Sequence, residues 1–443
     1  MKHKYQVVTF GCQMNEHDSE VLAGTMETLG YEHSEDLEKC DAIIINTCCV
    51  RESAENRILG YVGNLKRLKR IKPGLVIAIG GCMVQQPGMA EKIRKRASHV
   101  DIIFGTHHMH RLPQLITEAI NGGEVQINIE ENEGEIPENL PIKRQGSMKA
   151  QVTIMYGCNN FCTYCIVPYV RGRERSRAPE AIQKEIAALG REGFKEIMLL
   201  GQNVNSYGLD FEVPFDFADL LKSIDGKGGI ERIRYMTSHP RDFTSKLIDT
   251  IAGSKTVCEH FHLPIQAGSN KILKLMNRGY SRETYLSLIE EIRKKFSLCS
   301  ITTDIIVGFP GETDQDFTDT LKLMKEAQFD AAYTFLYSSR SGTPAAKMPE
   351  QIPLNVKKER LQMLMEIQNE ISLSINQKLI GQTVEILVEG ESKTSDQIMS
   401  GRTRTNKIVN FPGDKNTVGK LIHVDIKNAK TWHLEGKMIN SPQ

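Results

Sequence analysis

The chain has 443 residues, more than a single hydrophobic core usually serves, so we expect two or three domains. Its 56 lysines and arginines balance 55 aspartates and glutamates, which excludes a global positive field, although local basic patches can still bind RNA. The first residues lack the apolar core of a signal peptide, and no apolar run approaches the ~20 residues of a membrane span. We therefore expect a soluble, cytoplasmic protein whose ten cysteines are reduced.

The segment from residue 1 to about residue 122 alternates short apolar runs with charged stretches of helical length. Such alternation predicts βα units and an α/β fold with an open parallel sheet. The apolar runs that we interpret as strands are Tyr5–Phe10, Ala42–Ile45, Leu75–Ile79 and Ile102–Phe104.

A cysteine follows each of the first three predicted strands, at Cys12, Cys48 and Cys82. Because the carboxyl ends of parallel strands meet at one edge of a sheet, these thiols are expected within a few strand spacings of about 5 Å, close enough to share a metal cluster. Glycine precedes Cys12 and Cys82 and lets the backbone turn tightly around a bound group. The alternative is three unrelated core cysteines. Spacing alone does not separate Cys48 from its neighbour Cys49.

An acidic stretch with two prolines, residues 123–145, is rich in like charge and poor in apolar residues, so we interpret it as a linker. Residues 146–376 then carry six apolar runs separated by helical stretches. This pattern predicts a (β/α)6 partial barrel whose strand ends carry the site. The six runs lie near Val152, Ile197, Ile233, Phe261, Ile301 and Ala332.

The loop after the first of these strands reads C-x-x-x-C-x-x-C, with Cys158, Cys162 and Cys165. Three thiolates on one tight loop can bind three irons of a 4Fe-4S cube and leave the fourth iron for another ligand. An open metal position is typical of chemistry rather than of structure. The alternative, a zinc knuckle, normally needs a second C-x-x-C or a histidine pair, and neither lies nearby in the sequence.

Polar side chains at the ends of the later strands are candidates for contact with a bound cofactor. Each by itself is better explained by turn formation or helix capping, but all lie where ligands bind on such barrels. These candidates are Gln202, Asn203, Ser238, Gln266 and Asp304. The sequence has no P-loop and no G-x-G-x-x-G fingerprint, so nucleotide hydrolysis and hydride transfer from a dinucleotide are poorly supported.

Residues 377–443 contain five short predicted strands with glycine turns after the long helical stretch Asn355–Leu379, which predicts a small antiparallel β-barrel. Arg402, Arg404 and Lys407 contribute to a locally basic character. A solvated charged surface is the default interpretation. Clustered arginine and lysine on a small barrel are also a common means of binding RNA phosphates.

Four motifs, spread across nearly the whole chain, resemble those of the radical S-adenosylmethionine (SAM) methylthiotransferases. They are Thr9-Phe10-Gly11-Cys12-Gln13-Met14-Asn15, Asn46-Thr47-Cys48-Cys49-Val50-Arg51, Gly81-Cys82 and the segment that begins Tyr156-Gly157-Cys158. The resemblance implies an N-terminal domain with an auxiliary cluster, a radical SAM core and a C-terminal RNA-binding TRAM barrel. It also implies that Cys48, not Cys49, is the cluster ligand.

The resemblance further implies two 4Fe-4S clusters and SAM as cofactors. We call Cys158, Cys162 and Cys165 the core triad, and Cys12, Cys48 and Cys82 the auxiliary triad. The family uses a cluster at the core triad to cleave SAM to a 5′-deoxyadenosyl radical, with an aromatic residue, here Tyr164, beside the adenine. The auxiliary cluster would supply the sulfur.

Further strings resemble the branch of the family that acts on N6-isopentenyl-adenosine in tRNA, among them the run that begins Leu200-Gly201-Gln202-Asn203. This implies methylthiolation of carbon 2 of that base at position 37, in the anticodon stem-loop. Carbon 2 bears a hydrogen that is neither acidic nor a leaving group, so acid–base catalysis offers no easy route and a carbon radical does. An electron donor protein and an iron-sulfur carrier are implied partners, and we expect a monomer.

Arg171, Arg173 and Arg175 alternate with other residues just after the core triad. They are expected either to contact RNA phosphates near a flipped-out base or to pair with acidic neighbours. Two rival functions stay open. One is a methylthiotransferase that acts on threonylcarbamoyl-adenosine in tRNA or on a ribosomal protein, and the other is a non-enzymatic, metal-stabilised RNA-binding protein.

Overall fold

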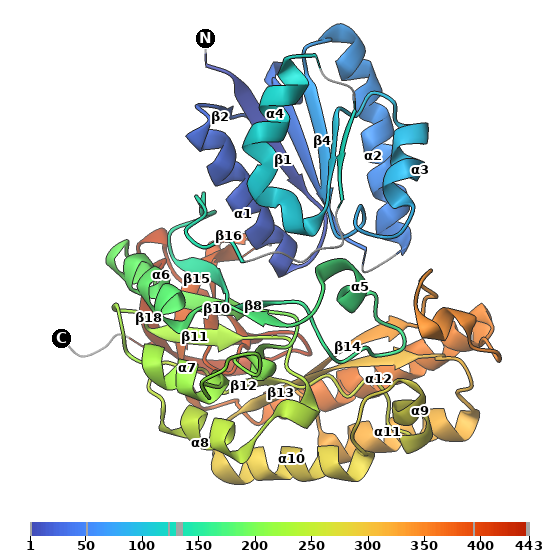
Figure 1. The fold of residues 1–443 in the computed structure, drawn as a ribbon. Helices are drawn as coiled ribbons and strands as arrows, with labels where there is room; N and C mark the ends of the chain where they lie inside the picture. Colours follow the sequence, from blue (N-terminus) through green and yellow to red (C-terminus); the bar gives the residue numbers. More distant parts are fainter. Residues whose placement is uncertain (1, 50–51, 123–124, 130–135, 393–394, 440–443) are drawn as a thin grey trace.

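The computed structural model describes residues 2–49, 52–122, 125–129, 136–392 and 395–439. Figure 1 shows an α/β unit formed by the N-terminal part of the chain, a larger α/β unit below it, and a small barrel formed by the C-terminal residues. None of the helices among these residues combines the length and apolar composition that a membrane span requires.

The N-terminal unit contains a six-stranded sheet in which every neighbouring pair is parallel. In spatial order its strands are β2 (Glu32–His33), β1 (Lys4–Thr9), β3 (Ala42–Thr47), β4 (Val76–Gly81), β5 (Ile102–Phe104) and β6 (Gln126–Asn128). The four apolar runs form the four central strands, so the predicted sheet is confirmed. The edge strands escape prediction because they are short and mostly polar. One of them, β6, lies inside the predicted linker, which is therefore not a linker throughout.

Helices cover both faces of this sheet because successive side chains of a strand point to opposite faces (Figure 1). Ile43 and Ile45 pack with α2 and α3, whereas Ala42 and Ile44 pack with α1 and α4. The helices and 3-10 turns of this unit are α1 (Gln13–Thr28), η1 (Leu37–Lys39), α2 (Glu52–Ile71), α3 (Met89–Arg96), η2 (Thr106–Arg111) and α4 (Leu112–Ile120).

The second unit has the six predicted parallel strands in two ladders of three, joined by a bridge between Ile233 and Val257. This arrangement is the predicted (β/α)6 partial barrel. The ladders are β7 (Lys149–Thr153), β10 (Glu196–Leu200) and β11 (Arg232–Tyr235), then β12 (His260–His262), β13 (Ser300–Val307) and β14 (Ala331–Leu336). A short antiparallel ribbon adds β8 (Met155–Tyr156) and β9 (Arg175–Ser176).

Most helices of the second unit lie on the outer side of its strands, whereas α5 lies at the junction with the N-terminal unit (Figure 1). The helices of this unit are α5 (Val167–Arg171), α6 (Pro179–Arg191), α7 (Phe217–Ile224), α8 (Ser245–Gly253), α9 (Asn270–Leu275), α10 (Arg282–Lys295), α11 (Asp314–Ala327) and α12 (Leu354–Gln377). The 3-10 turns are η3 (Val204–Ser206), η4 (Pro240–Asp242) and η5 (Pro344–Lys347).

The C-terminal strands close into a barrel in the order β15-β16-β17-β19-β18, as predicted except for one pairing. Its elements are β15 (Thr383–Ser392), β16 (Ser395–Thr403), β17 (Ile408–Pro412), η6 (Lys415–Thr417), β18 (Leu421–Ala429) and β19 (Leu434–Met438). β17 and β19 pair in parallel, which corrects the fully antiparallel expectation. A closed ring with an odd number of strands cannot alternate in direction throughout, so one parallel pair is required.

Two buried arginines of β11 dock this barrel on the second unit. Arg232 donates to the carbonyl oxygen of Arg402 at 2.6 Å, and Arg234 donates to those of Thr403 at 2.7 Å and Arg404 at 2.8 Å. The first residues of β12, β13 and β14 line a cavity of about 160 Å³ together with barrel residues. The barrel thus covers the amino ends of the core strands, and the carboxyl ends remain for the site.

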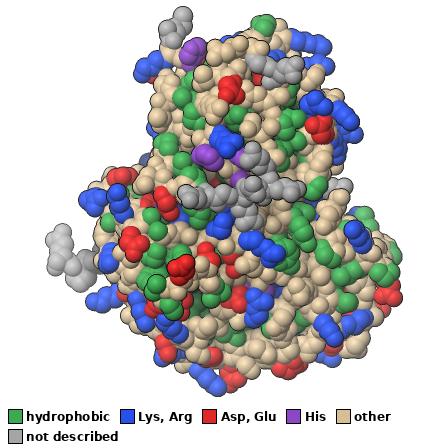
Figure 2. Space-filling view, in the orientation of Figure 1, with side chains coloured by type: hydrophobic (Ala, Val, Ile, Leu, Met, Phe, Trp, Pro, Cys, Tyr) green, Lys and Arg blue, Asp and Glu red, His purple; other side chains and the backbone are tan. Residues whose placement is uncertain are grey.

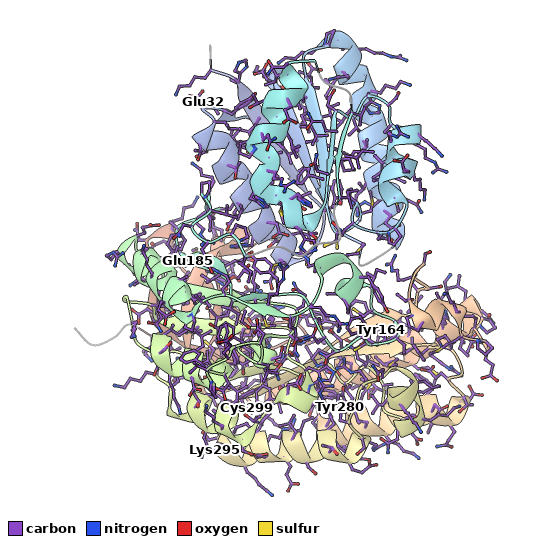
Figure 3. The ribbon with its side chains drawn as sticks, viewed as in Figure 1. Glu32, Tyr164, Glu185, Tyr280, Lys295 and Cys299 are labelled. Atoms are coloured by element: carbon purple, nitrogen blue, oxygen red, sulfur yellow. The ribbon has the colours of Figure 1, made fainter. Side chains whose placement is uncertain are left out.

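An ion-pair cluster fixes the described part of the predicted linker where the first two units meet. Glu185 of α6, labelled at this junction in Figure 3, accepts hydrogen bonds from Arg144 at 2.5 Å and Arg177 at 2.8 Å. Arg144 also pairs with Glu20 of α1 at 3.2 Å, and Arg177 with Glu138 at 2.7 Å. Buried charges are held in place by their partners, so this stretch joins the two units firmly.

Candidate active site

The auxiliary triad lies at one edge of the N-terminal sheet. Cys12 is the N-cap residue just before α1, Cys48 follows β3 and Cys82 follows β4. β1, β3 and β4 are neighbours in that order, and Thr47 is paired with Gly81, so Cys48 and Cys82 continue adjacent strands. The structure therefore brings the three predicted thiols to the same sheet edge.

Two buried asparagines tie these strand ends together. The Asn15 amide donates to Asn46 Oδ1 at 3.2 Å and to the Thr47 carbonyl oxygen at 2.9 Å. The Asn46 amide donates in return to the Asn15 carbonyl oxygen at 2.8 Å, and the Cys12 thiol donates to Asn15 Oδ1 at 3.4 Å. Both asparagines belong to the motifs that carry the family resemblance, and their reciprocal bonds give those motifs a physical role.

Gly81 is the position where this edge leaves no room for a side chain. Its φ is +98°, and a Cβ atom there would lie 2.5 Å from the Thr47 carbonyl oxygen and 2.6 Å from Asn46 Oδ1. Only glycine combines this backbone conformation with so close an approach of another strand end. The glycine before Cys82 therefore permits the loop that presents that thiol.

The surroundings of Cys12 and Cys82 favour the thiolate form. A hydrogen bond with Cys48, supported by Arg171 and by backbone N–H groups at the start of α1, lowers the pKa of Cys12 to about 6. The pKa of Cys82 is also lowered, mainly by a hydrogen bond with Cys49 and further by Arg171. Thiolate is the form that binds iron.

Cys48 and Cys49 are both buried beside the other two thiols. Cys48 contacts Cys12, whereas Cys49 contacts Cys82 and packs with Ile58 in the apolar cluster between the sheet and α2. The assignment of Cys48 as the ligand stays a prediction.

The core triad lies on the loop that connects β8 to α5. Gly157 opens this loop with a φ of +76°, and a Cβ atom there would lie 1.9 Å from the Arg173 carbonyl oxygen. The Gly157 N–H donates to Gln202 Oε1 at 2.6 Å, and the Cys158 N–H donates to the Gly172 carbonyl oxygen at 3.1 Å. These bonds fold the start of the loop against the chain that follows the triad.

Two side-chain donors point at sulfur atoms of the core triad. Arg278 Nη1 donates to Cys162 Sγ at 3.3 Å, and the Asn160 amide donates to Cys158 Sγ at 3.4 Å. Such donors fit thiolates that share the negative charge of a cluster. Burial raises the pKa of Cys158 to about 11 and that of Cys165 to about 12, so iron binding here is expected to release protons.

No three Cys, His, Asp or Glu side chains in the described part of the chain converge closely enough to hold a single metal ion. In a cluster each cysteine binds a different iron, so its thiols stand further apart than the ligands of one ion.

A cavity of about 810 Å³ opens beside the core triad. Tyr164 and Cys165 line it together with Gln266 and Asp304, so three predicted cofactor contacts share one cavity with a triad cysteine. Asn56 of α2 lines it as well, which places the cavity between the first two units. Its size suits a small-molecule ligand.

The other three predicted cofactor contacts are not among the residues that line this cavity. Gln202 is held by Gly157, and the Asn203 amide donates to Asp242 Oδ2 at 2.9 Å. Ser238 is buried, and its hydroxyl has no hydrogen-bond partner within the described ranges. A buried hydroxyl of this kind can serve a bound ligand.

Backbone strain marks two of the strand ends around the site. Thr237, next to Ser238, has a φ of +65°, and Gln266 has a φ of +75°. Residues other than glycine adopt such angles at a cost of roughly 1–3 kcal/mol, and they concentrate at functional sites. Neither angle is foreseeable from the sequence, because threonine and glutamine have no preference for it.

The basic residues of the C-terminal barrel that were expected to contact RNA are ion-paired within the protein. Arg402 pairs with Glu389 at 3.1 Å, Arg404 with Glu259 at 2.7 Å and Lys407 with Asp330 at 2.5 Å. Acids of the second unit thus pair with Arg404 and Lys407, and contact of the three side chains with RNA stays a prediction.

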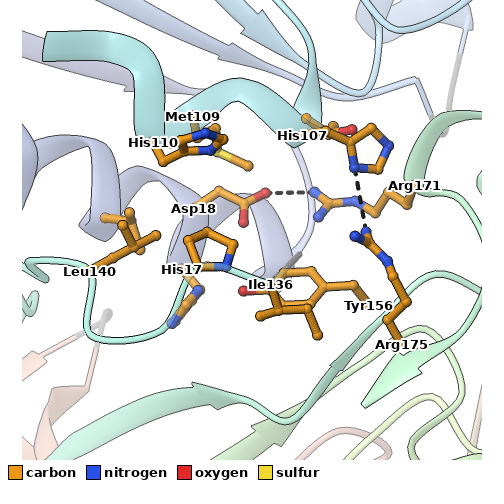
Figure 4. Close-up of a pocket in the computed structure, with 13 residues that line it drawn as sticks. His17, Asp18, His107, Met109, His110, Ile136, Leu140, Tyr156, Arg171 and Arg175 are labelled. Atoms are coloured by element: carbon orange, nitrogen blue, oxygen red, sulfur yellow. Dashed lines mark hydrogen bonds and ion pairs between the residues drawn. The ribbon is translucent and has the colours of Figure 1, made fainter. Parts of the chain in front are cut away.

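Arg171 and Arg175 lie at the junction of the first two units, beside a cavity of about 60 Å³ (Figure 4). Arg171 is 4% exposed and pairs with Asp18 of α1 at 2.6 Å. Arg175 approaches His107 Nδ1 at 3.4 Å, and burial, with Arg175 adding to it, lowers the pKa of that histidine to about 4. Of the two expectations for Arg171, pairing with an acidic residue is the one that this contact shows, and contact with RNA stays a prediction.

Arg173 is the member of this series that reaches the surface. Its guanidinium lies 4.4 Å from the centre of the Phe161 ring, which meets the ring of Tyr169 edge-on at 5.7 Å between centroids. Tyr169 is 45% exposed. Figure 2 shows charges of both signs mixed with apolar groups on this face of the molecule, so local clusters of this kind are the candidates for RNA contact.

Comparisons with known proteins give the family. The model of the radical SAM superfamily matches residues 152–324, the model described as uncharacterized protein family UPF0004 matches residues 4–105, and the TRAM domain matches residues 377–439. Over 434 residues the chain is 57% identical to a tRNA-2-methylthio-N(6)-dimethylallyladenosine synthase of Pelotomaculum thermopropionicum, covering 98% of this chain and 97% of that protein. The chain belongs to the radical SAM methylthiotransferase family. The expected membership is thus confirmed, and the protein is an enzyme of that family.

Other relatives of this methylthiotransferase carry the same name, that of the MiaB type. The protein of Acetivibrio thermocellus is 55% identical, covering 99% of this chain and 91% of that protein. The protein of Moorella thermoacetica is 55% identical, covering 98% of each. The match therefore extends over all three units of the fold.

Solved structures share the fold of this methylthiotransferase at low sequence identity. The radical SAM methyltransferase TsrM from Kitasatospora setae, with cobalamin and a [4Fe-4S] cluster bound, is 14% identical with a TM-score of 0.58, covering 90% of this chain and 81% of that one. The cobalamin-dependent enzyme OxsB has a TM-score of 0.53 at 13% identity, covering 83% and 56%. At this identity only the arrangement of the chain is shared.

Proposed function

We propose that this methylthiotransferase transfers a methylthio group to carbon 2 of N6-isopentenyl-adenosine at position 37 of tRNA. The names of its relatives support this substrate. The observation that carries the proposal is the contact between the two cysteine sites, in which Arg171 of α5, the helix that follows the core triad, donates to Cys82 Sγ at 3.1 Å. A radical and a sulfur atom must reach the same carbon, and this contact supports a shared reaction space.

Each site residue has a proposed role. The core triad would hold a 4Fe-4S cluster with SAM in the adjoining cavity, and the auxiliary triad would hold a second 4Fe-4S cluster. When bound, these groups supply the carbon radical and the sulfur. Tyr164 would pack against the adenine of SAM, and Gln266 and Asp304 would offer it hydrogen-bonding groups from the same cavity. Arg278 would keep Cys162 oriented through the bond to its sulfur.

RNA contact is proposed for basic side chains that face solvent. Arg173 and Tyr169 would meet the anticodon stem-loop beside the core triad, since aromatic rings and arginine planes stack on unpaired bases. On the C-terminal barrel, Lys420, Lys427 and Lys430 are exposed, and Trp432 nearby is 60% exposed. This is the combination that single-stranded RNA binds.

We retain the proposed division into residues 1–122, 123–145, 146–376 and 377–443, with β6 inside the second segment. We propose that the enzyme acts in the cytoplasm as a monomer. Its partners would be an electron donor protein and an iron-sulfur carrier, because SAM cleavage consumes an electron and the auxiliary site gives up sulfur.

The test compares three preparations of the same tRNA, which are isopentenylated, unmodified and threonylcarbamoylated at position 37. Each is incubated anaerobically with reconstituted enzyme, SAM and a reductant, and the nucleosides are identified by mass spectrometry. We expect a gain of one methylthio group on the isopentenylated tRNA alone. A product on the threonylcarbamoylated tRNA or on a ribosomal protein would favour the first rival function. Colourless, zinc-containing protein without product would favour the second.

A further inference from the structure

Arg171 is a buried cation that reaches from one cysteine site to the other. It is the last residue of α5, a five-residue helix that begins at Val167, just after Cys165. Its guanidinium lies inside the N-terminal unit, where it pairs with Asp18 Oδ2 at 2.6 Å and donates from Nε to Cys82 Sγ at 3.1 Å. Figure 4 shows the bond between Arg171 and Asp18 across the junction.

Burial of this cation is offset by two hydrogen-bonding partners, Asp18 and Cys82. A charge removed from water costs several kcal/mol unless it is paired and hydrogen-bonded. Burial by itself would lower the pKa of Arg171, but Asp18, Cys82 and Cys12 outweigh it and raise the pKa well above its usual value. Because Asp18 is 3% exposed and Cys82 is 6% exposed, water has little access to either partner.

The core triad has an equivalent donor. Arg278 is likewise buried and donates from Nη1 to Cys162 Sγ at 3.3 Å, while its Nη2 donates to the Pro264 carbonyl oxygen at 2.7 Å. Each triad thus has one sulfur that faces one buried guanidinium. The same arrangement, a buried guanidinium that donates to a cysteine sulfur, occurs on two unrelated loops. This indicates that the cysteine sites require the donor, and that it is not a by-product of packing.

We propose that Arg171 is a positioning residue that fixes Cys82 and tunes the auxiliary cluster from the core unit. This inference rests on the proposed function, which supplies the second cluster. A hydrogen bond and a positive charge at a ligand sulfur stabilise the reduced, more negative cluster and so raise its reduction potential. The same residue ties the auxiliary triad to the helix that follows Cys165, so the distance between the two sites depends on it.

Substitutions of Arg171 can distinguish this positioning role from simple packing, because arginine differs from lysine in the geometry of its donors. Its planar guanidinium presents several donors in a fixed fork, so it can bind Asp18 and Cys82 at once, whereas lysine offers a point charge with different reach. Arg171→Lys should therefore keep the charge and lose part of the geometry. Arg171→Gln removes the charge, and the double variant Arg171→Gln with Asp18→Asn removes it without leaving a buried acid unpaired.

A matched control is available in Arg234 of β11. It is also buried, pairs with Glu196 at 2.8 Å and donates only to oxygen atoms in the bonds that the structure shows, those of Glu196, Thr403 and Arg404. Arg234→Gln thus removes a buried cation of the same kind without removing a donor to a cysteine sulfur.

The experiment uses the full chain in a Cys158→Ala, Cys162→Ala, Cys165→Ala background, so that iron is bound by the auxiliary triad alone. After anaerobic reconstitution, the midpoint potential and the electron paramagnetic resonance spectrum of the reduced cluster are measured. We expect a lower midpoint potential and an altered spectrum for Arg171→Gln and for the double variant, a smaller shift for Arg171→Lys, and no shift for Arg234→Gln.

Unshifted potentials in iron-loaded Arg171→Gln and in the double variant would overturn the inference while leaving the proposed function intact. An equal shift in Arg234→Gln would also overturn it, because the effect would then be general. If Arg171→Gln and the double variant failed to hold iron while Arg171→Lys and Arg234→Gln held it, positioning of Cys82 would be supported. A background that bound no iron would overturn the two-cluster proposal itself.

Discussion

Gly81 is a residue at which backbone conformation and close packing both require glycine. In Gly81→Ala the alanine backbone would have to adopt a φ of +98°, and its Cβ atom would lie 2.5 Å from the Thr47 carbonyl oxygen. We expect a loss of about 2–3 kcal/mol in unfolding free energy, together with reduced iron at the auxiliary triad. Thermal unfolding and iron analysis measure these effects.

Gly60 of α2 provides the control for that substitution. It lies inside the helix, and a Cβ there would have no neighbour within 4 Å. Gly60→Ala should leave iron binding unchanged and stabilise the helix by up to ~1 kcal/mol. Equal stability and iron content in the two variants would contradict the role assigned to Gly81.

His17 of α1 makes stability depend on pH. Burial, followed by the charges of Arg144, Arg177 and Arg171, lowers its pKa to about 3 from 6.5. Between these two pH values His17 binds a proton in the unfolded chain but not in the folded protein. Its neutral, buried state therefore does not reduce the unfolding free energy above pH 6.5, and the unfolding free energy falls as the pH drops below that value.

The variant His17→Gln removes this titration. From pH 7 to pH 5 the wild type should lose about 2 kcal/mol more unfolding free energy than the variant. Chemical denaturation at the two pH values measures the difference. Equal losses would show that His17 is not kept neutral by its surroundings.

Among the elements, those with a regular apolar pattern were predictable from the sequence. β3 and β13 combine runs of branched apolar residues with full burial or nearly so, and the thiols and polar groups that follow such strands were found for the same reason. β6 was not predictable, because the sequence Gln-Ile-Asn has one apolar residue and takes its conformation from β5. The parallel pairing of β17 with β19 follows from barrel closure, which no local pattern contains.

In our proposal, RNA binds the outer surface of β18 and of the turns that flank it. The triple variant Lys420→Ala, Lys427→Ala, Lys430→Ala should bind tRNA more weakly. The slope of log affinity against log salt concentration should become less negative by about 2 to 3, because each lost phosphate contact removes nearly one released counterion. Binding titrations at several salt concentrations measure this slope.

A second triple variant tests whether any loss of positive charge has the same effect. Lys294, Lys295 and Lys322 on α10 and α11 are 74%, 47% and 58% exposed in their side chains. Their replacement by alanine should leave affinity and slope nearly unchanged. The same loss in both variants, or none in the first, would move RNA binding away from the barrel.

At the scale of the whole molecule, contacts between distant segments explain what sequence reasoning missed. Arg404 pairs with Glu259, which lies 145 residues away in the chain, so its sequence neighbours do not show that its charge is neutralised. Arg171 likewise pairs with Asp18, 153 residues away. Local patterns located the cysteines, whereas the side chains that position them, Arg171 and Arg278 among them, required the fold.

The same contacts give the other two units distinct positions on the core strands. The C-terminal barrel covers the amino ends of the core strands, and the N-terminal unit meets their carboxyl ends, where Asn56 shares a cavity with Cys165. The proposed reaction, in which both triads would act on one base, depends on this meeting of the first two units.

The most direct measurement is the iron and sulfide content of anaerobically reconstituted protein, assayed together with nucleoside products. It compares the wild type with variants in which the auxiliary triad or the core triad is replaced by alanine. We predict that each variant holds half the iron of the wild type, that neither forms methylthiolated tRNA, and that the variant lacking the auxiliary triad still cleaves SAM. Full iron content or methylthiolated tRNA in that variant would contradict the account.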